Sequence, residues 1–193
     1  SCGEGGAFLT KSSVLAERAE IIREKGTDRS KFFRGEIDKY SWIDVGSSFL
    51  PSELNAAYLL AQLEEAQSIT EKRLNIWQRY QSAFLELEQN GLVTRPIVPN
   101  ECQHNGHIYY LILSDVESRD KFITYMKERL IGTTFHYVPL HNSNYAKIHT
   151  RNGTSLVTTE DMASRIVRLP IWPGLDVHVD YIVEQTNNFF KES

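Results

Sequence analysis

Residues 17–64 read ERAEIIREKGTDRSKFFRGEIDKYSWIDVGSSFLPSELNAAYLLAQLE and contain two helical patterns separated by an irregular loop. In the first pattern, apolar residues recur at helical spacing from residue 13 to the Lys-Gly pair at 25–26, where the helix should end. Residues 27–51 are polar and aromatic without a clean period, and irregular loops of this length are often functional. The order Pro-Ser-Glu at 51–53, with Ser52 as the cap, is typical of a helix start. The block therefore predicts a helix, a functional loop and a second helix.

Toward the N-terminus, the chain begins SCGEGGAFLT, with three glycines around one acidic residue. Glycines at this density suit a tight turn or a close approach of the backbone to a ligand. Residues 5–9 then predict a short strand that leaves the glycine loop.

Toward the C-terminus, the second helical pattern runs from residue 52 to the Asn-Gly stop at 90–91. About 38 residues at about 1.5 Å each would give a helix of roughly 57 Å. A helix of this length exceeds one small domain, so it either connects two lobes or breaks midway, near residues 67–70.

The remaining residues predict a small α+β lobe. After a Pro-rich connector we expect, in order, a strand at 107–113, a helix at 118–130, a strand at 133–140 broken by Pro139, a helix at 158–169, an extended path at 168–175 and a closing helix at 177–191.

Composition places the 193-residue chain among ordinary soluble globular proteins, with 41% hydrophobic and 24% charged residues. A net charge of −4 gives no basic surface for nucleic acid, and no apolar run approaches the length of a membrane span. Cys2 and Cys102 form no metal-binding pattern and are expected to be free thiols.

Five pieces of sequence, taken in order, resemble the C-terminal half of the sugar-nucleotide aminotransferases. These are pyridoxal phosphate (PLP) enzymes with the α/β architecture of aspartate aminotransferase, fold type I. The matching pieces are GEGGAFLT at 3–10, the block at 17–64, HIYYLIL at 107–113, FHYVPLH at 135–141 and RLPIWPGL at 168–175. The block at 17–64 is the most specific of them. It is most similar to the branch of the family that makes dTDP-4-amino-4,6-dideoxygalactose.

The resemblance implies a domain organisation. Residues 1–51 would be the end of the large PLP-binding domain with an active-site loop. Residues 52–90 would be a long connecting helix, and residues 91–193 a small α+β C-terminal domain.

The resemblance also implies an activity for the full-length protein. A cytoplasmic homodimer with PLP would transfer an amino group from glutamate to C4 of a dTDP-4-keto-6-deoxy sugar, for surface polysaccharides such as lipopolysaccharide and enterobacterial common antigen. A different keto sugar remains an alternative. The Schiff-base lysine of the family would lie upstream of Ser1, so we expect no catalytic residue in this chain, no PLP bound to it alone and no activity. The alternative from another class is a non-catalytic dimerisation or scaffold protein.

Two segments near the cofactor follow from the resemblance. Gly3, Glu4, Gly5 and Gly6 would form an active-site loop beside the lysine, although a plain turn is the alternative. Ser48 occupies the position of an asparagine that reaches the PLP phosphate of the other subunit, and a serine hydroxyl can also donate to a phosphate oxygen. Leu50 replaces the arginine of the family pattern, so a charged contact is lost. Otherwise Ser48 only ends a loop.

The resemblance places three further residues, His136, Tyr137 and His141, beside the substrate sugar or its phosphates, with a structural role as the alternative. Strand alternation predicts that Tyr137 points away from His136. The histidines lack further ligands at metal-binding spacing, so no metal site is expected. Arg34 and Lys39 lie among cations and aromatic residues that suit either the substrate phosphates or a dimer interface.

Overall fold

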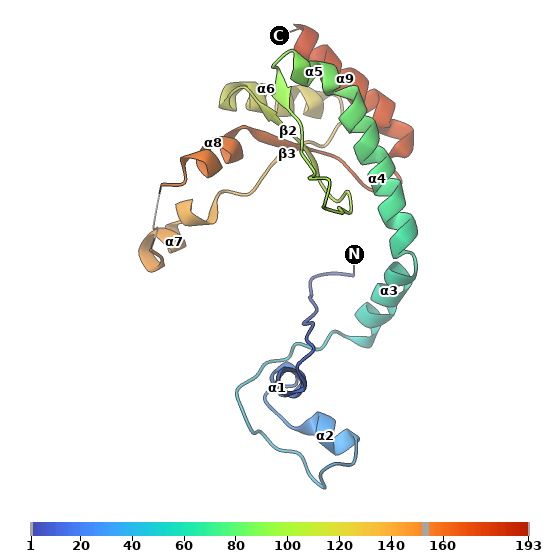
Figure 1. Cartoon of the computed structure of the whole chain (residues 1–193), viewed down its shortest axis with the longest axis vertical. Coiled ribbons are helices and arrows are strands. Elements are labelled where there is room, and N and C mark those ends of the chain that lie inside the picture. The colour runs from blue at the N-terminus through green and yellow to red at the C-terminus, as the bar shows by residue number, and fades with distance from the viewer. Residues whose placement is uncertain (1, 152–154, 193) are drawn as a thin grey trace. The chain divides into compact units, whose positions relative to one another are not determined.

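The computed structural model describes residues 2–151 and 155–192, and the chain forms two compact units (Figure 1). The N-terminal unit ends at Ala66 and the C-terminal unit begins at Gln67. This division falls inside the stretch 52–90 that the sequence suggested as one connecting element. The reason lies in burial, because no residue of the first helix of this stretch is buried, whereas the second contributes Ile76, Trp77 and Tyr80 to a core.

The N-terminal unit contains helices α1 (Ser13–Arg23), α2 (Arg29–Phe33) and α3 (Glu53–Glu64). Serine side chains begin the two longer helices: the Ser12 hydroxyl accepts a hydrogen bond from the Leu15 N–H at 3.4 Å, and the Ser52 hydroxyl accepts one from the Asn55 N–H at 3.2 Å. The predicted helix starts are therefore confirmed. The predicted strand at residues 5–9 is wrong for this structure, because no described segment pairs with it.

The loop between α1 and α3 is closed at its base by backbone contacts. Gly26 O accepts from the N–H groups of Ile43 at 2.9 Å and Asp44 at 3.0 Å, and Lys25 N–H donates to Ser47 O at 3.1 Å. The backbones approach so closely that a Cβ on Gly26 would lie 1.8 Å from Asp44 O. Gly26 also has a φ of +75°, a conformation that favours glycine. The loop is therefore ordered, and backbone hydrogen bonds hold its two ends together.

The stretch 52–90 is not one helix. A turn at Glu65 separates α3 from α4 (Ala66–Ala83), two residues before the range in which a break was predicted. A second turn at Phe84 precedes α5 (Leu85–Gln89), although Phe84 N–H still donates to Tyr80 O at 3.1 Å. Gly91, with a φ of +71°, follows the last helix, as the Asn-Gly pair predicted.

The C-terminal unit is an α+β lobe built on a four-stranded sheet, and the predicted fold class of this segment is confirmed. The strand order is β1 (Val93–Thr94), β2 (Tyr109–Leu113), β4 (Ile166–Leu169) and β3 (Thr134–Phe135), and all pairs are antiparallel. Helix α6 (Val116–Glu128) connects β2 to β3, with β4 inserted between them. The later helices are α7 (Asn144–His149), α8 (Val157–Arg165) and α9 (Val179–Glu192), with 3-10 turns at Leu140–Asn142 and Asp176–His178.

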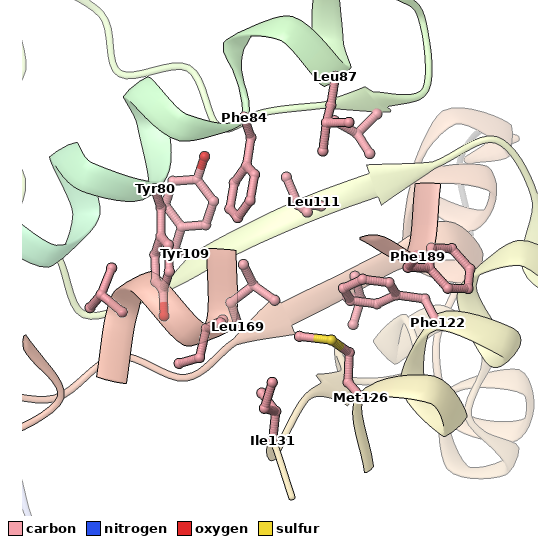
Figure 2. Close-up of a cluster of buried hydrophobic side chains, with 14 of the residues drawn as sticks. Tyr80, Phe84, Leu87, Tyr109, Leu111, Phe122, Met126, Ile131, Leu169 and Phe189 are labelled. Carbon is pink, nitrogen blue, oxygen red and sulfur yellow. The ribbon is translucent and has the colours of Figure 1, made fainter. Parts of the chain in front are cut away.

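One face of the sheet carries the hydrophobic core. Alternate residues of β2 and β4 are buried on it, namely Tyr109, Leu111, Leu113, Val167 and Leu169. Side chains from α4, α5, α6 and α9 pack on this face (Figure 2), including Tyr80, Phe84, Leu87, Phe122, Met126 and Phe189. The opposite face of the sheet carries the alternate residues of these strands, Tyr110, Ile112, Ile166 and Arg168.

Two predicted elements of this unit differ from the structure. The helix expected at 158–169 ends at Arg165, and Ile166–Leu169 forms strand β4 because these residues pair with both β2 and β3. The strand expected at 133–140 is reduced to the two residues of β3. Strand β1 and helix α7 were not predicted.

Candidate functional site

Ser48 is presented by the closed loop of the N-terminal unit. The loop base holds its neighbours, because Ser47 N–H donates to Ile22 O at 3.0 Å and Phe49 N–H donates to Arg23 O at 3.1 Å. Ser48 itself is exposed, and neither its N–H nor its hydroxyl bonds to another described residue. Two adjacent donors of this kind can bind a phosphate oxygen.

The same loop carries the two cations expected at the substrate phosphates. Arg34 forms ion pairs with Glu36 at 2.6 Å and with Glu20 at 3.0 Å, and hydrogen bonds from its guanidinium to these carboxylates raise the pKa of Arg34. Its charge is therefore already balanced within the unit. Lys39 is exposed and has no ion-pair partner among the described residues, so it is the better placed of the two to meet an anion.

The aromatic residues of this loop pack on a third cation, Arg29, which belongs to the same group of cations and aromatic residues but is not one of the two expected at the substrate phosphates. The guanidinium carbon of Arg29 lies 5.0 Å from the ring centre of Phe33 and 5.7 Å from that of Tyr40. Arg29 also donates to Glu24 at 3.0 Å. These contacts hold the guanidinium and the two rings together and so help to order the loop.

The glycine loop at the start of the chain is exposed. Gly3 has a φ of +102°, while a Cβ on Gly5 or Gly6 would meet nothing within 4 Å. Glu4 is exposed as well. The role of these residues beside a cofactor lysine stays a prediction.

His141 has a partner inside the C-terminal unit. Its Nε2 lies 3.0 Å from Oε1 of Glu160, and its side chain is only 15% exposed. The contact ties the turn Leu140–Asn142 to α8. Nineteen residues separate the partners, so sequence spacing gave no signal for this pair.

His136 and Tyr137 meet Arg168 on the face of the sheet opposite the core. Arg168 lies across from Tyr110 on β2 and Thr134 on β3. The Tyr137 ring centre is 5.9 Å from the Arg168 guanidinium carbon and 5.3 Å from the His136 ring. The prediction that Tyr137 points away from His136 is wrong, because β3 ends at Phe135 and the alternation ends with it.

A cavity of about 670 Å³ is lined partly by residues of this face and partly by Trp77, which belongs to the core cluster. Its lining includes Trp77, Ile108, Tyr110, His136, Ile166 and Arg168. Of these, the sequence singled out only His136 as a site residue. Tyr110 and Arg168 were missed because their meeting depends on the pairing of β2 with β4, which are distant in sequence.

Residues 2–151 and 155–192 contain no group of three His, Cys, Asp or Glu side chains that could hold a metal ion. In the same described ranges, no helix is both long and apolar enough to cross a membrane.

Comparisons with curated proteins give relatives that are longer than this chain. The uncharacterised protein MJ1066 of Methanocaldococcus jannaschii is 30% identical over 180 residues, which are 90% of this chain and 46% of that protein. The spore coat polysaccharide biosynthesis protein SpsC of Bacillus subtilis is 27% identical over 198 residues, covering 98% of this chain and 50% of SpsC. The chain thus spans about half the length of the curated relatives it matches.

Solved structures share the fold at lower identity. Helicobacter pylori PseC, an aminotransferase involved in the biosynthesis of pseudoaminic acid, superposes with a TM-score of 0.81 at 21% identity, over 95% of this chain and 48% of PseC. Spr1654 of Streptococcus pneumoniae, in its PLP-form, gives a TM-score of 0.74 at 19% identity over 95% of this chain and 45% of that one.

The family itself is shown by a match along almost the whole chain. The model of the DegT/DnrJ/EryC1/StrS aminotransferase family matches residues 1–187. The predicted family is confirmed: this chain belongs to the DegT/DnrJ/EryC1/StrS aminotransferase family.

Proposed function

We propose that this chain is the C-terminal part of a PLP-dependent sugar-nucleotide aminotransferase. The full-length protein would transfer the amino group of glutamate to C4 of a dTDP-4-keto-6-deoxy sugar, and the product would serve surface polysaccharide synthesis. The observation that carries this proposal is the family match over residues 1–187. The names of SpsC and PseC, which concern polysaccharide and pseudoaminic acid biosynthesis, support a sugar substrate. The dTDP-4-keto sugar rests on the similarity of the block at 17–64.

The residues of this chain fit a supporting role toward PLP. The N–H and hydroxyl of Ser48 are exposed donors without a described partner, as a phosphate ligand requires. When bound, PLP supplies an electron sink for the amino-group transfer. Tyr137 and His136 would contact the sugar, and Lys39 would meet its phosphates. Arg34 and His141 would act through their carboxylate partners, by holding the loop and the turn in place.

The catalytic lysine is proposed to lie outside this chain, because the family pattern places it just before the glycine loop. The chain alone is then inactive and does not hold PLP. Cytoplasmic location and a homodimer complete the proposal, since nucleotide sugars are cytoplasmic and the Ser48 position contacts the other subunit's cofactor in the family. The family match favours this reading over a scaffold protein.

The test is to sequence the DNA upstream of the Ser1 codon and express the whole reading frame. The purified protein should convert dTDP-4-keto-6-deoxyglucose with glutamate into an amino sugar and 2-oxoglutarate, both measured by mass spectrometry. The 193-residue chain, assayed in parallel, should give no product. Any of three results would contradict the proposal: a start codon or a stop codon close upstream of the Ser1 codon, turnover by the chain alone, or no transfer by the whole protein to any keto sugar.

A further inference from the structure

Asparagine followed by glycine occurs twice among the described residues, at 90–91 and at 105–106. In such a pair the glycine nitrogen can attack the side-chain carbonyl carbon of the asparagine and displace its amide. Glycine favours this attack because it has no Cβ to hinder the approach and because its backbone is permissive. The two pairs lie in different surroundings, so their reactivities can be compared within one chain.

Asn90 is held in a conformation that opposes the reaction. It ends α5 with a ψ of 2°, so the Gly91 nitrogen eclipses the backbone nitrogen of Asn90 and stands away from its Cβ. The attack closes a five-membered ring that contains this Cβ, and therefore needs the Gly91 nitrogen on the Cβ side. The Gly91 N–H also donates to Glu88 O at 2.9 Å. The end of the helix must unwind before this pair can react.

Asn105 is exposed and lies outside the helices and strands, between β1 and β2. Its Oδ1 lies 3.2 Å from the backbone nitrogen of His107 and 2.6 Å from Nδ1 of the same residue. Because a carbonyl oxygen only accepts, Nδ1 carries the proton in this contact. Two donors on one carbonyl oxygen stabilise the negative charge that develops there when its carbon is attacked.

The attacking nitrogen of this pair is not held by another group. Among the described residues, no acceptor bonds to the Gly106 N–H, so the loss of its proton breaks no hydrogen bond. His107 and the free N–H together distinguish this pair from Asn90 and Gly91.

We propose that Asn105 is a site of deamidation in the folded chain, promoted by His107. The Gly106 nitrogen gives its proton to a solvent base and bonds to Cγ of Asn105. The Cγ–Nδ2 bond breaks, and Nδ2 takes a proton from water and leaves as ammonia. Water then hydrolyses the resulting succinimide at either carbonyl, to aspartate or isoaspartate. This inference does not depend on the proposed aminotransferase function.

The reaction would change the cavity that Asn105 helps to line. None of the described lining residues is acidic, so either product introduces a carboxylate into a lining that includes Arg168. Isoaspartate also adds a methylene group to the backbone beside Gly106. A Cβ on Gly106 would lie only 3.0 Å from the carbonyl carbon of Arg73, so the longer backbone should loosen the contact of this loop with α4.

The test is incubation of the 193-residue chain at mildly alkaline pH, followed by peptide mapping with mass spectrometry that separates asparagine, aspartate and isoaspartate. In the folded chain, Asn105 should convert several times faster than Asn90. His107→Ala keeps the backbone donor but removes Nδ1, and should slow conversion of Asn105 about threefold or more. His104→Ala is the matched control, because His104 lines the same cavity but packs on the Trp77 ring at 4.6 Å. It should leave the rate unchanged.

A second incubation in urea separates the effect of the structure from that of the sequence. Once both sites are unfolded, the two asparagines should convert at similar rates. Circular dichroism melts establish that the variants are folded in the first incubation. Three outcomes would overturn the proposal: equal rates at Asn105 and Asn90 in the folded chain, an unchanged rate at Asn105 in folded His107→Ala, or a preference for Asn105 that persists in urea.

Discussion

At the scale of single residues, Ser48 of the N-terminal unit has a hydroxyl in a defined place and without a partner among the described residues. Replacing Ser48 by Ala removes that donor while the loop base, which uses only its neighbours' backbone, stays intact. A hydrogen bond to a charged group contributes about 1.5–3 kcal/mol. We therefore expect Ser48→Ala to weaken PLP binding by the whole protein by about 10- to 100-fold, measured by fluorescence titration.

Ser47→Ala is the matched control, because Ser47 is the adjacent exposed hydroxyl and its backbone holds the loop base. It should leave PLP affinity unchanged. Equal losses in both variants would show that the loop, and not the Ser48 hydroxyl, determines affinity.

Gly26 carries a different residue-scale constraint. Its Cα faces Asp44 O so closely that a methyl group cannot enter, and its φ is +75°. Gly35 has nearly the same φ, +72°, but a Cβ there meets nothing within 4 Å. Gly35→Ala should lower the stability of the closed loop only by the strain of a left-handed alanine, about 1–2 kcal/mol. Gly26→Ala should cost an additional amount on the order of 1–3 kcal/mol, as overpacking does.

The measurement is the rate of trypsin cleavage in the loop after Lys31, Arg34 and Lys39, because cleavage follows the population of the open loop. Cleavage of Gly26→Ala should exceed that of Gly35→Ala about tenfold or more. Equal rates would mean that the close approach at Gly26 does not hold the loop.

At the scale of elements, an ion pair joins α5 to the segment that follows β1. Glu88 accepts from the backbone N–H of Arg95 at 2.8 Å and from its Nη2 at 2.6 Å. Burial raises the pKa of Glu88, but the hydrogen bonds and charge of Arg95 outweigh this, so the net pKa is lowered. Arg95 also donates to Gln81 O near the end of α4, so its guanidinium bonds to both α4 and α5.

Because the folded pKa of Glu88 is lowered, its contribution to stability is present above the ordinary carboxyl pKa of about 4.3 and is lost as pH falls through the lowered value. Glu88→Gln should reduce the free energy of unfolding at pH 7 by about 1–3 kcal/mol. It should also flatten the loss of stability that the unchanged chain shows below about pH 5, measured by urea unfolding at several pH values.

Glu117→Gln is the control for this prediction, because Glu117 pairs with Lys121 at 2.8 Å on an exposed helix face. Such pairs contribute little. An effect of Glu117→Gln as large as that of Glu88→Gln would contradict the assigned role of Arg95.

Some elements could be predicted from the sequence and others could not. Helix starts at Ser12 and Ser52 were predictable because a cap bonds to residues three positions away. The local sequence of strand β4 predicts the end of a helix, because its true conformation is fixed by pairing with β2, more than fifty residues earlier. The same cause explains why two residues of the cavity could not be predicted. His136 lies in a recognisable motif, whereas Arg168 and Tyr110 come together only through the pairing of β2 with β4.

At the scale of the whole molecule, the two units are stabilised by different interactions. In the C-terminal unit, eighteen buried hydrophobic residues form one core cluster. Among described residues 2–66, no large hydrophobic side chain is buried, and the buried positions are Glu24, Gly26 and Thr27. Surface ion pairs bind α1 to the loop there, namely Arg18 with Asp44, Lys31 with Glu17 and Arg34 with Glu20.

This contrast predicts how the chain responds to salt. At 1 M ionic strength the Debye length is about 3 Å, so exposed ion pairs are screened while hydrophobic burial is not weakened. In hydrogen–deuterium exchange with mass spectrometry, amides of α1 and the loop should exchange faster than those of β2 at low salt, and severalfold faster again in about 1 M NaCl. Amides of Tyr109–Leu113 are the internal control and should not change. A salt response shared equally by both units would show that the chain unfolds as one cooperative body, and that ion pairs do not set the stability of its N-terminal unit.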